Sequence, residues 1–328
     1  MFIKSVAIAT AAITVFGRDS PYFDDQDAPF WFVGIGKGHI TGLGARKRPP
    51  SPLADIGAKE LLQVANNGPT PEVRALAIRT LGRRSPASPA AMVAVWVRDP
   101  SIAVRRAGVL ASADLPDREP IMTASTNDSP DLRHTAALAV GFAQDPGLVP
   151  LLGKLLQDRV ADVRNAAAMS LLSFAPDQAA PAMEANLASD FRPLFVNALA
   201  SGDPQPYLEM LAEVIEQQGV GPSDWKRPEN WNYGGTIPAA DSWRILFDFV
   251  KSRPAAELTA GKLDRSLDAL ERMHWFGSGG PTALYTLYLS RGLVSRAKQF
   301  RDTTRKSVPF DMDLFFDRVD RNSAAYAQ

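Results

Sequence analysis

The feature that most constrains the fold is a set of four similar helical segments that recur along the chain without gaps. They start at Pro71, Ser101, Pro130 and Ala161, and each places a branched apolar residue before an arginine. Small or apolar residues follow at helical spacing, as is typical of amphipathic helices with a closely packed face. The sequence therefore predicts one repeated structural unit rather than a single compact core.

The regular spacing of the arginines sets the length of this unit. By subtraction of residue numbers, Arg74, Arg105, Arg133 and Arg164 lie 31, 28 and 31 residues apart, and a weaker fifth copy places Arg192 another 28 residues on. Shorter apolar segments lie between the arginine-bearing helices and end in polar or Gly/Pro-containing turns. A period near thirty with two helices in each copy predicts a stack of helical hairpins.

Three aspartates precede the repeat arginines by five or six residues, which suits the N-terminal turn of each helix. They are Asp99, Asp128 and Asp158. The combined pattern over residues 54–201 resembles HEAT repeats, particularly the short type also found in phycobilisome lyase-like proteins. The resemblance implies that these aspartates and the repeat arginines form a structural ladder linking neighbouring hairpins. The other reading of the arginines is a basic stripe that binds phosphates.

The expected fold class is all-α. The resemblance implies an α-solenoid of about five HEAT-like hairpins over 54–218, with small residues such as Ala77, Ala107, Ala136 and Ala167 allowing the helices to approach. Residues 241–328 are also expected to be helical, although the repeat signature is missing there. These further helices are read either as degenerate hairpins that close the superhelix or as a separate helical domain, and the first reading is favoured.

The N-terminal region differs from the repeats. Residues 1–17 carry a lysine and then about a dozen apolar residues, which predicts a secretory signal peptide or an anchor, with a buried strand as the alternative. Residues 18–53 are aromatic and glycine-rich and are expected to form an irregular, extended or hairpin-like arm. Its aromatic residues, Trp31 among them, are read as a cap on the first repeat or as partner contacts.

Two further segments are candidates for binding a partner. Residues 219–240 form a long Pro/Gly-containing loop that carries Trp225, Trp231 and Tyr233, and it is expected either to dock on the solenoid or to bind a partner. Residues 291–306 are rich in cations opposed by Asp302 alone, and the candidates there are Arg291, Arg296, Arg301 and Arg305. This segment is read as a solvated helix face or as a site for an acidic partner, phosphate or anionic lipid.

Composition argues against most kinds of chemistry. Lys plus Arg and Asp plus Glu both number 36, so no net field draws the chain to nucleic acid, and the absence of cysteine removes thiolate sites. The three histidines, His39, His134 and His274, show no metal-ligand spacing, and no catalytic motif is present. The sequence therefore predicts no catalytic residues, no cofactor and no metal site.

The expected function is a non-enzymatic scaffold that binds one or more proteins, as an accessory or structural subunit of a larger complex. The predicted signal places that complex in the periplasm or at a membrane, with the cytoplasm as the alternative. The alternatives for function are a HEAT-like enzyme, because DNA glycosylases and bilin lyases resemble this architecture, a nucleic-acid or tetrapyrrole-binding protein, and a homo-oligomeric coat.

Overall fold

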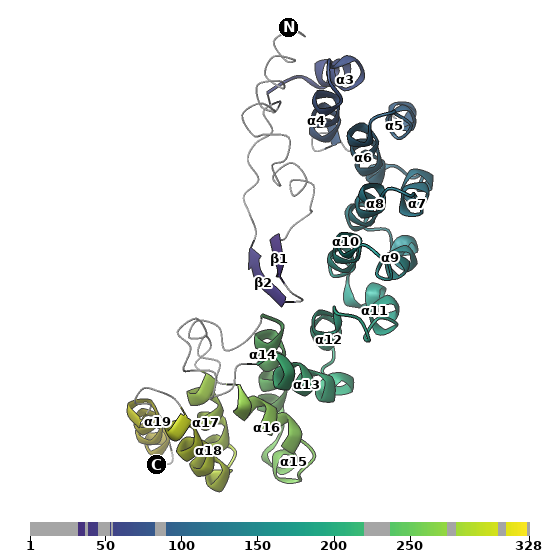
Figure 1. Ribbon diagram of the computed structural model, residues 1–328. Coiled ribbons are helices and arrows are strands. Elements are labelled where there is room, and N and C mark those ends of the chain that lie inside the picture. The colour runs from purple at the N-terminus through teal and green to yellow at the C-terminus, as the bar shows by residue number, and fades with distance from the viewer. Residues whose placement is uncertain are drawn as a thin grey trace. The chain divides into compact units, whose positions relative to one another are not determined.

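The computed structural model describes residues 32–36, 39–44, 53, 55–82, 90–219, 237–273, 280–307 and 313–326. The chain packs as two compact units (Figure 1). The first contains the described helices up to Asn186, and the second contains those from Leu187 onward together with residues 33–43. The division falls inside the region 54–218 that was expected to form one run of hairpins.

The first unit is built from helix pairs, which confirms the expected α-solenoid. The first helices of the pairs are α3 (Ala58–Asn67), α5 (Ala90–Trp96), α7 (Glu119–Ser125), α9 (Val149–Leu155) and α11 (Pro176–Glu184). The second helices are α4 (Pro71–Gly82), α6 (Ile102–Ala111), α8 (Pro130–Ala143) and α10 (Ala161–Leu171), with short 3-10 turns η1 (Ser112–Asp114) and η2 (Pro146–Leu148). In Figure 1 the first helices form one layer and the second helices another.

The layer of second helices forms the continuous core of this unit. Helix α4 packs on α6, α6 on α8, and α8 on α10. The small residues expected at these contacts, Ala77, Ala107, Ala136 and Ala167, are at most 1% exposed. Helices approach closely where such small side chains face each other, so dispersion contacts accumulate along the whole layer.

Two glycines lie where neighbouring elements of the first unit approach closely. A Cβ added at Gly108 in α6 would lie 2.9 Å from the Val97 backbone nitrogen and 2.9 Å from the Trp96 Cβ. A Cβ at Gly141 in α8 would lie 2.7 Å from the Ser170 Oγ of α10. These positions therefore need glycine for space rather than for an unusual backbone angle.

The second unit is a helical bundle with its own core. Its elements are α12 (Arg192–Ala200), η3 (Gln205–Tyr207), α13 (Leu208–Gln218), α14 (Ile237–Ser252), α15 (Ala255–Thr259), α16 (Asp264–Arg272), α17 (Gly280–Ser290), α18 (Val294–Ser307) and α19 (Asp313–Tyr326). The core holds Trp243, Tyr288 and Phe316, each at most 2% exposed. The helix of the fifth repeat, α12, packs on α13 and α14 in this bundle, where Asn197 accepts a hydrogen bond from the buried Ser242.

The N-terminal arm is described only in part. Strands β1 (Phe32–Gly36) and β2 (His39–Gly44) pair as a two-stranded sheet. The segment 1–17 and the rest of the arm, with Trp31, lie outside the described residues. The loop residues Trp225, Trp231 and Tyr233 also lie outside them, so their expected roles stay predictions. Among the helices that are described, none is long and apolar enough to cross a membrane.

Candidate functional site

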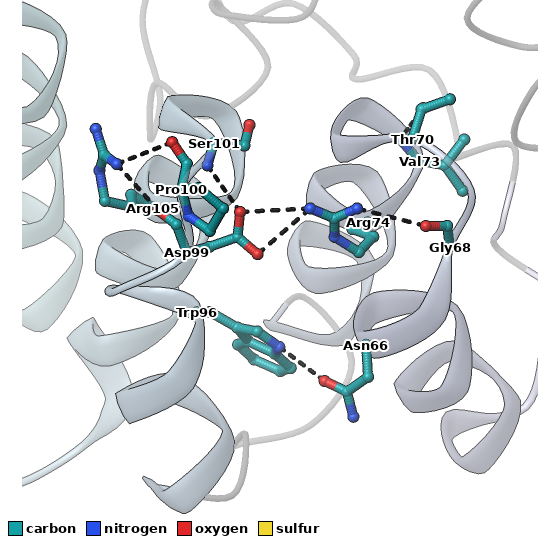
Figure 2. Close-up of polar contacts among 10 residues, drawn as sticks. All are labelled: Asn66, Gly68, Thr70, Val73, Arg74, Trp96, Asp99, Pro100, Ser101 and Arg105. Atoms are coloured by element: carbon teal, nitrogen blue, oxygen red, sulfur yellow. Dashed lines mark hydrogen bonds and ion pairs between the residues drawn. The ribbon is translucent and has the colours of Figure 1, made fainter.

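The turn between the two helices of a pair holds the first Arg–Asp contact (Figure 2). Arg74 of α4 reaches the next hairpin and donates to both carboxylate oxygens of Asp99 at 3.3 Å. Asp99 also accepts a hydrogen bond from the Ser101 backbone N–H at 2.8 Å, which fixes the turn before α6. One carboxylate thus closes its own turn and ties it to the preceding helix.

The same arrangement recurs two hairpins along, with shorter distances. Arg133 donates to the Asp158 carboxylate at 2.6 and 3.0 Å, and to the backbone oxygens of Asn127 and Asp128 in its own turn. The Arg133 and Asp158 side chains are only 10% and 9% exposed. Their hydrogen bond raises the pKa of Arg133 and lowers the pKa of Asp158, so both groups remain charged at neutral pH.

The two intervening arginines lack a carboxylate partner among the described residues. Arg105 donates to the backbone oxygens of Asp99 and Pro100, as Figure 2 shows, and Arg164 donates to the Asp158 backbone oxygen. The difference depends on the residue that lies six positions before the arginine of the following repeat, where an aspartate can form the ion pair. Along the chain this position holds Gly68, Asp99, Asn127, Asp158 and Asn186.

The expected ladder role of Asp128 therefore needs correction. Asn127, and not Asp128, occupies the turn position equivalent to Asp99, and its side chain accepts from the Ser129 backbone N–H at 3.0 Å. Asp128 is exposed, and within the described chain its carboxylate forms no ion pair. The Asp128 charge makes only a minor contribution to the raised pKa of Arg133. The ladder thus alternates between ion-paired and neutral steps.

Arg192, the arginine of the fifth copy, pairs with a glutamate instead of an aspartate. It contacts the Glu213 carboxylate of α13 at 2.5 Å. Arg265 of α16 shares Glu213 at 3.7 Å and also pairs with Glu209 and Glu216 of the same helix. Arg192 therefore belongs to a charge network of the second unit.

A third Arg–Asp contact was not anticipated from the sequence. Arg118, directly before α7, donates to the Asp145 carboxylate at 3.0 Å, and Asp145 accepts from the Gly147 backbone N–H. The hydrogen bond from Arg118 lowers the pKa of Asp145. Arg118 lies outside the repeated arginine pattern, and the one sequence signal for its partner is the Asp-Pro-Gly turn at 145–147.

The cation-rich segment 291–306 forms most of α18, and Arg296, Arg301 and Arg305 form ion pairs with other helices. Arg296 pairs with Asp264, Asp268 and Glu271 of α16, at 3.5, 2.6 and 2.6 Å. Arg301 pairs with Asp313, Asp317 and Asp320 of α19, at 3.5, 2.6 and 2.7 Å. Each guanidinium thus joins α18 to one neighbour through three carboxylates.

Aromatic residues complete both of these clusters. The Tyr288 hydroxyl donates to Glu271 at 2.6 Å, and the Tyr285 hydroxyl donates to Asp320 at 2.7 Å. Burial followed by the Glu271 charge raises the pKa of Tyr288. Burial acts to lower the pKa of Arg301, but its contacts with Asp317 and Tyr285 outweigh that effect and raise it. The hydroxyls and guanidinium groups therefore keep their protons at any ordinary pH.

These contacts occupy several arginines of 291–306, and the expectation that the segment binds an anionic partner or surface stays a prediction. Arg305 also pairs with Asp313 at 2.8 Å, and Arg291 donates to the Lys251 backbone oxygen at 2.6 Å. The local excess of positive charge was counted along the sequence alone. The carboxylates that pair with these arginines lie in α16 and α19, outside the segment 291–306.

A comparison with known protein families finds a match for the part of the chain that contains the Arg133–Asp158 contact. A family model for HEAT repeats matches residues 119–202, which run from α7 to α12. Residues 119–202 therefore carry HEAT repeats. No curated protein matches the chain. The match does not distinguish the short, phycobilisome lyase-like type, so that finer assignment stays a prediction.

The histidines and the carboxylates are the potential metal ligands among the described residues. The part of the chain that is described contains no group of three or more metal-ligating side chains. His134 lies half-buried in α8, directly after the ladder arginine, while His274 lies outside the described residues. The charged residues of highest burial, Arg133 and Asp158, are paired with each other.

We expect the HEAT stack to lose stability on acidification through Asp158. Its folded pKa is lowered, so its contribution to the free energy of unfolding is complete above the unfolded value near 3.9 and is lost as the pH falls through the folded value. Thermal unfolding at pH 7, 5, 4 and 3 measures this effect. Asp158→Asn should lower the melting temperature at pH 7 and approach wild type at pH 3.

The exposed Asp162→Asn, four residues along, is the matched control for that experiment and should follow wild type at every pH. Asp114 works in the opposite sense, because burial raises its pKa and acidification relieves the cost of its charge. Its effect cancels when variant and wild type are subtracted. A constant gap between Asp158→Asn and wild type from pH 7 to 3 would contradict the prediction.

We expect Arg301→Ala to loosen α19 from the bundle. Three aspartates would lose their shared cation and repel one another, at a cost of about 1 to 2 kcal/mol because the arginine is 22% exposed. Hydrogen exchange of the α19 amides should accelerate accordingly. Arg305→Ala removes one ion pair of an arginine that is 62% exposed, and should change exchange by less than about 0.5 kcal/mol. Equal effects would show that Arg301 is not the principal tie.

Proposed function

We propose that this HEAT-repeat protein is a non-enzymatic scaffold that binds other proteins, as an accessory or structural subunit of a larger complex. HEAT repeats suggest protein interaction in general. Stacked helical hairpins offer long surfaces whose side chains can vary without disturbing the core. The charged residues that hold this stack are used in contacts within the chain, which leaves recognition to other positions.

The observation that carries the proposal is a repeated surface on the layer of second helices. Positions one and five residues after each ladder arginine lie on one helix face, because residues four apart are neighbours. In three successive repeats these pairs are Arg106 and Leu110, His134 and Leu138, and Asn165 and Met169. All are half-buried except Leu138, which is 5% exposed.

Half-buried Phe142, eight residues after His134, continues this face along α8. We call this set of residues the second-helix face. It combines apolar side chains with a few polar ones, and Arg106 is oriented by its hydrogen bond to Thr135 of the next helix at 3.1 Å. Such a mixed surface with fixed polar groups is typical of protein interfaces.

Photocrosslinking of the intact protein in its own cells tests this function. The crosslinker p-benzoylphenylalanine would replace Phe142 or Met169 on the second-helix face. Val95 of α5 is 58% exposed on the other layer and serves as the matched control position. We expect one protein adduct of defined mass from both test positions and none from Val95. Crosslinks to nucleic acid, or none from either test position, would contradict the proposal.

Duplex DNA and tetrapyrrole binding are two of the other readings of a HEAT-like protein, and both can be measured directly. We expect no salt-dependent shift of duplex DNA mobility, because a protein that neutralises phosphates loses affinity steeply with salt. We also expect no change in the absorption spectrum of a linear tetrapyrrole on addition of the protein. A positive result in either titration would favour that reading over the scaffold.

We further propose that the complex is periplasmic or associated with the membrane. Support for this location comes from the apolar stretch within residues 1–17. Gentle fractionation followed by mass spectrometry of the N-terminus tests it. Recovery in the envelope fraction is the expected outcome. A soluble cytoplasmic protein with residues 1–17 intact would overturn the location and leave the scaffold function to be judged by crosslinking.

A further inference from the structure

Helix α19 has one face that belongs to the bundle core. Phe316 is fully buried and packs edge-on against Tyr285, with ring centroids 4.9 Å apart. Arg301 lies over the Phe316 ring at 5.7 Å and pairs with the three aspartates of this helix. This face is therefore fully used in holding α19 to α17 and α18.

The opposite face carries large apolar side chains in solvent. Leu314 is 71% exposed and Phe315 is 55% exposed. Few of the large hydrophobic side chains described are exposed, and these two are adjacent in sequence. Arg318 and Arg321 are also exposed and lie four and seven residues after Leu314, on the same side of the helix. We call these four residues the outer α19 face.

The charges of α19 are distributed unequally between the two faces. Asp313, Asp317 and Asp320 all point to Arg301, with Asp313 also paired to Arg305. Arg318 and Arg321 form no ion pair with any described residue. The outer face therefore presents two apolar groups beside two cations that pair with no carboxylate in the described part of the chain.

We propose that the outer α19 face docks into an acidic protein partner, whose apolar pocket takes Leu314 and Phe315 and whose carboxylates meet Arg318 and Arg321. Arginine pairs well with carboxylates through two parallel hydrogen bonds, and an amphipathic helix commonly binds with its apolar face in a groove. Basic segments that bind anionic membranes usually carry four to eight cations, whereas this face carries two. The inference rests on the proposed scaffold function but uses a surface separate from the second-helix face.

Site-specific photocrosslinking in the organism that makes the protein tests this docking. The crosslinker p-benzoylphenylalanine replaces Leu314, and in a matched control it replaces Val294, which is 59% exposed on α18. We expect a single protein adduct from position 314 and none from 294. Mass spectrometry should place the crosslink in a segment of net negative charge. In the same background, Arg318→Glu with Arg321→Glu should reduce the adduct at least ten-fold.

Retention of structure by these variants is checked by hydrogen exchange of α19, because all the substituted side chains are exposed. A lipid adduct, similar yields at 294 and 314, absence of any adduct, or insensitivity to the charge reversal would each overturn the docking. The role of the second-helix face fails separately, if no crosslink forms from Phe142 or Met169. An adduct from 314 alone would keep this inference and reject the second-helix face.

Discussion

Replacing Arg133 with methionine is expected to destabilise the contact between α8 and α10 by about 3 kcal/mol, because the Asp158 carboxylate would remain buried without its cation. Methionine keeps much of the apolar stem of arginine, so the loss reports the guanidinium group. The backbone oxygens of Asn127 and Asp128 would also lose their donor. Hydrogen exchange of α8 and α10 amides measures the local free energy of opening.

Arg105→Met is the matched control, since Arg105 occupies the equivalent position one repeat earlier. It donates to the backbone oxygens of Asp99 and Pro100 at 2.9 and 3.1 Å and has no carboxylate partner within the described chain. We expect a loss of about 1 kcal/mol, which is typical of ordinary hydrogen bonds. Equal losses for the two variants would mean that the Asp158 carboxylate adds nothing to the ladder.

The second large effect is expected for Gly108→Ala. The added methyl group would meet the Val97 backbone nitrogen and the Trp96 Cβ at 2.9 Å, so α5 and α6 would have to separate. Overpacking of this kind costs about 2 to 3 kcal/mol and outweighs the gain of about 1 kcal/mol in helix propensity. Thermal unfolding should show a lower melting temperature, and Trp96 fluorescence should shift toward that of exposed indole.

Gly153→Ala provides the comparison for that variant. Gly153 lies inside α9, and an added methyl group would approach only the Ala182 Cβ, at an ordinary 3.8 Å. The gain in helix propensity should then appear as a stabilisation of up to about 1 kcal/mol. Destabilisation of Gly153→Ala to the same degree as Gly108→Ala would refute the role assigned to the close approach.

The sequence was sufficient to predict the repeated helices. Apolar and small residues recur at helical spacing, and Ala77, Ala107, Ala136 and Ala167 are buried as that pattern requires. Spacing also identified the arginines that face the turns. Local periodicity carries this information because each hairpin buries its apolar side mainly against its immediate neighbours.

The partners of those arginines were harder to predict. The sequence pattern predicts Asp128 in the ladder, because an aspartate five or six residues before the arginine suits the N-terminal turn of the helix, but the turn geometry requires six. Asn127 therefore occupies the position that Asp99 and Asp158 hold in the adjacent repeats. Counting back six residues from each arginine would have found it.

The contacts of the α18 arginines could not be predicted for a different reason. Their excess charge was judged against Asp302, the carboxylate within the same segment, whereas Arg296 and Arg301 meet six carboxylates of α16 and α19. No periodic pattern links these helices, so their contacts could not be found by spacing.

By itself, the sequence determined that this chain forms helical hairpins of about thirty residues, because helix amphipathicity and small-residue packing depend on the spacing of residues that are close in sequence. Only the tertiary structure decided which charges neutralise each other and which remain at the surface. Ion pairing depends on distances of a few ångströms between side chains, and these are fixed only when separate helices pack. The unbalanced Arg318 and Arg321 beside Leu314 could be recognised only once the aspartates of α19 were placed on Arg301.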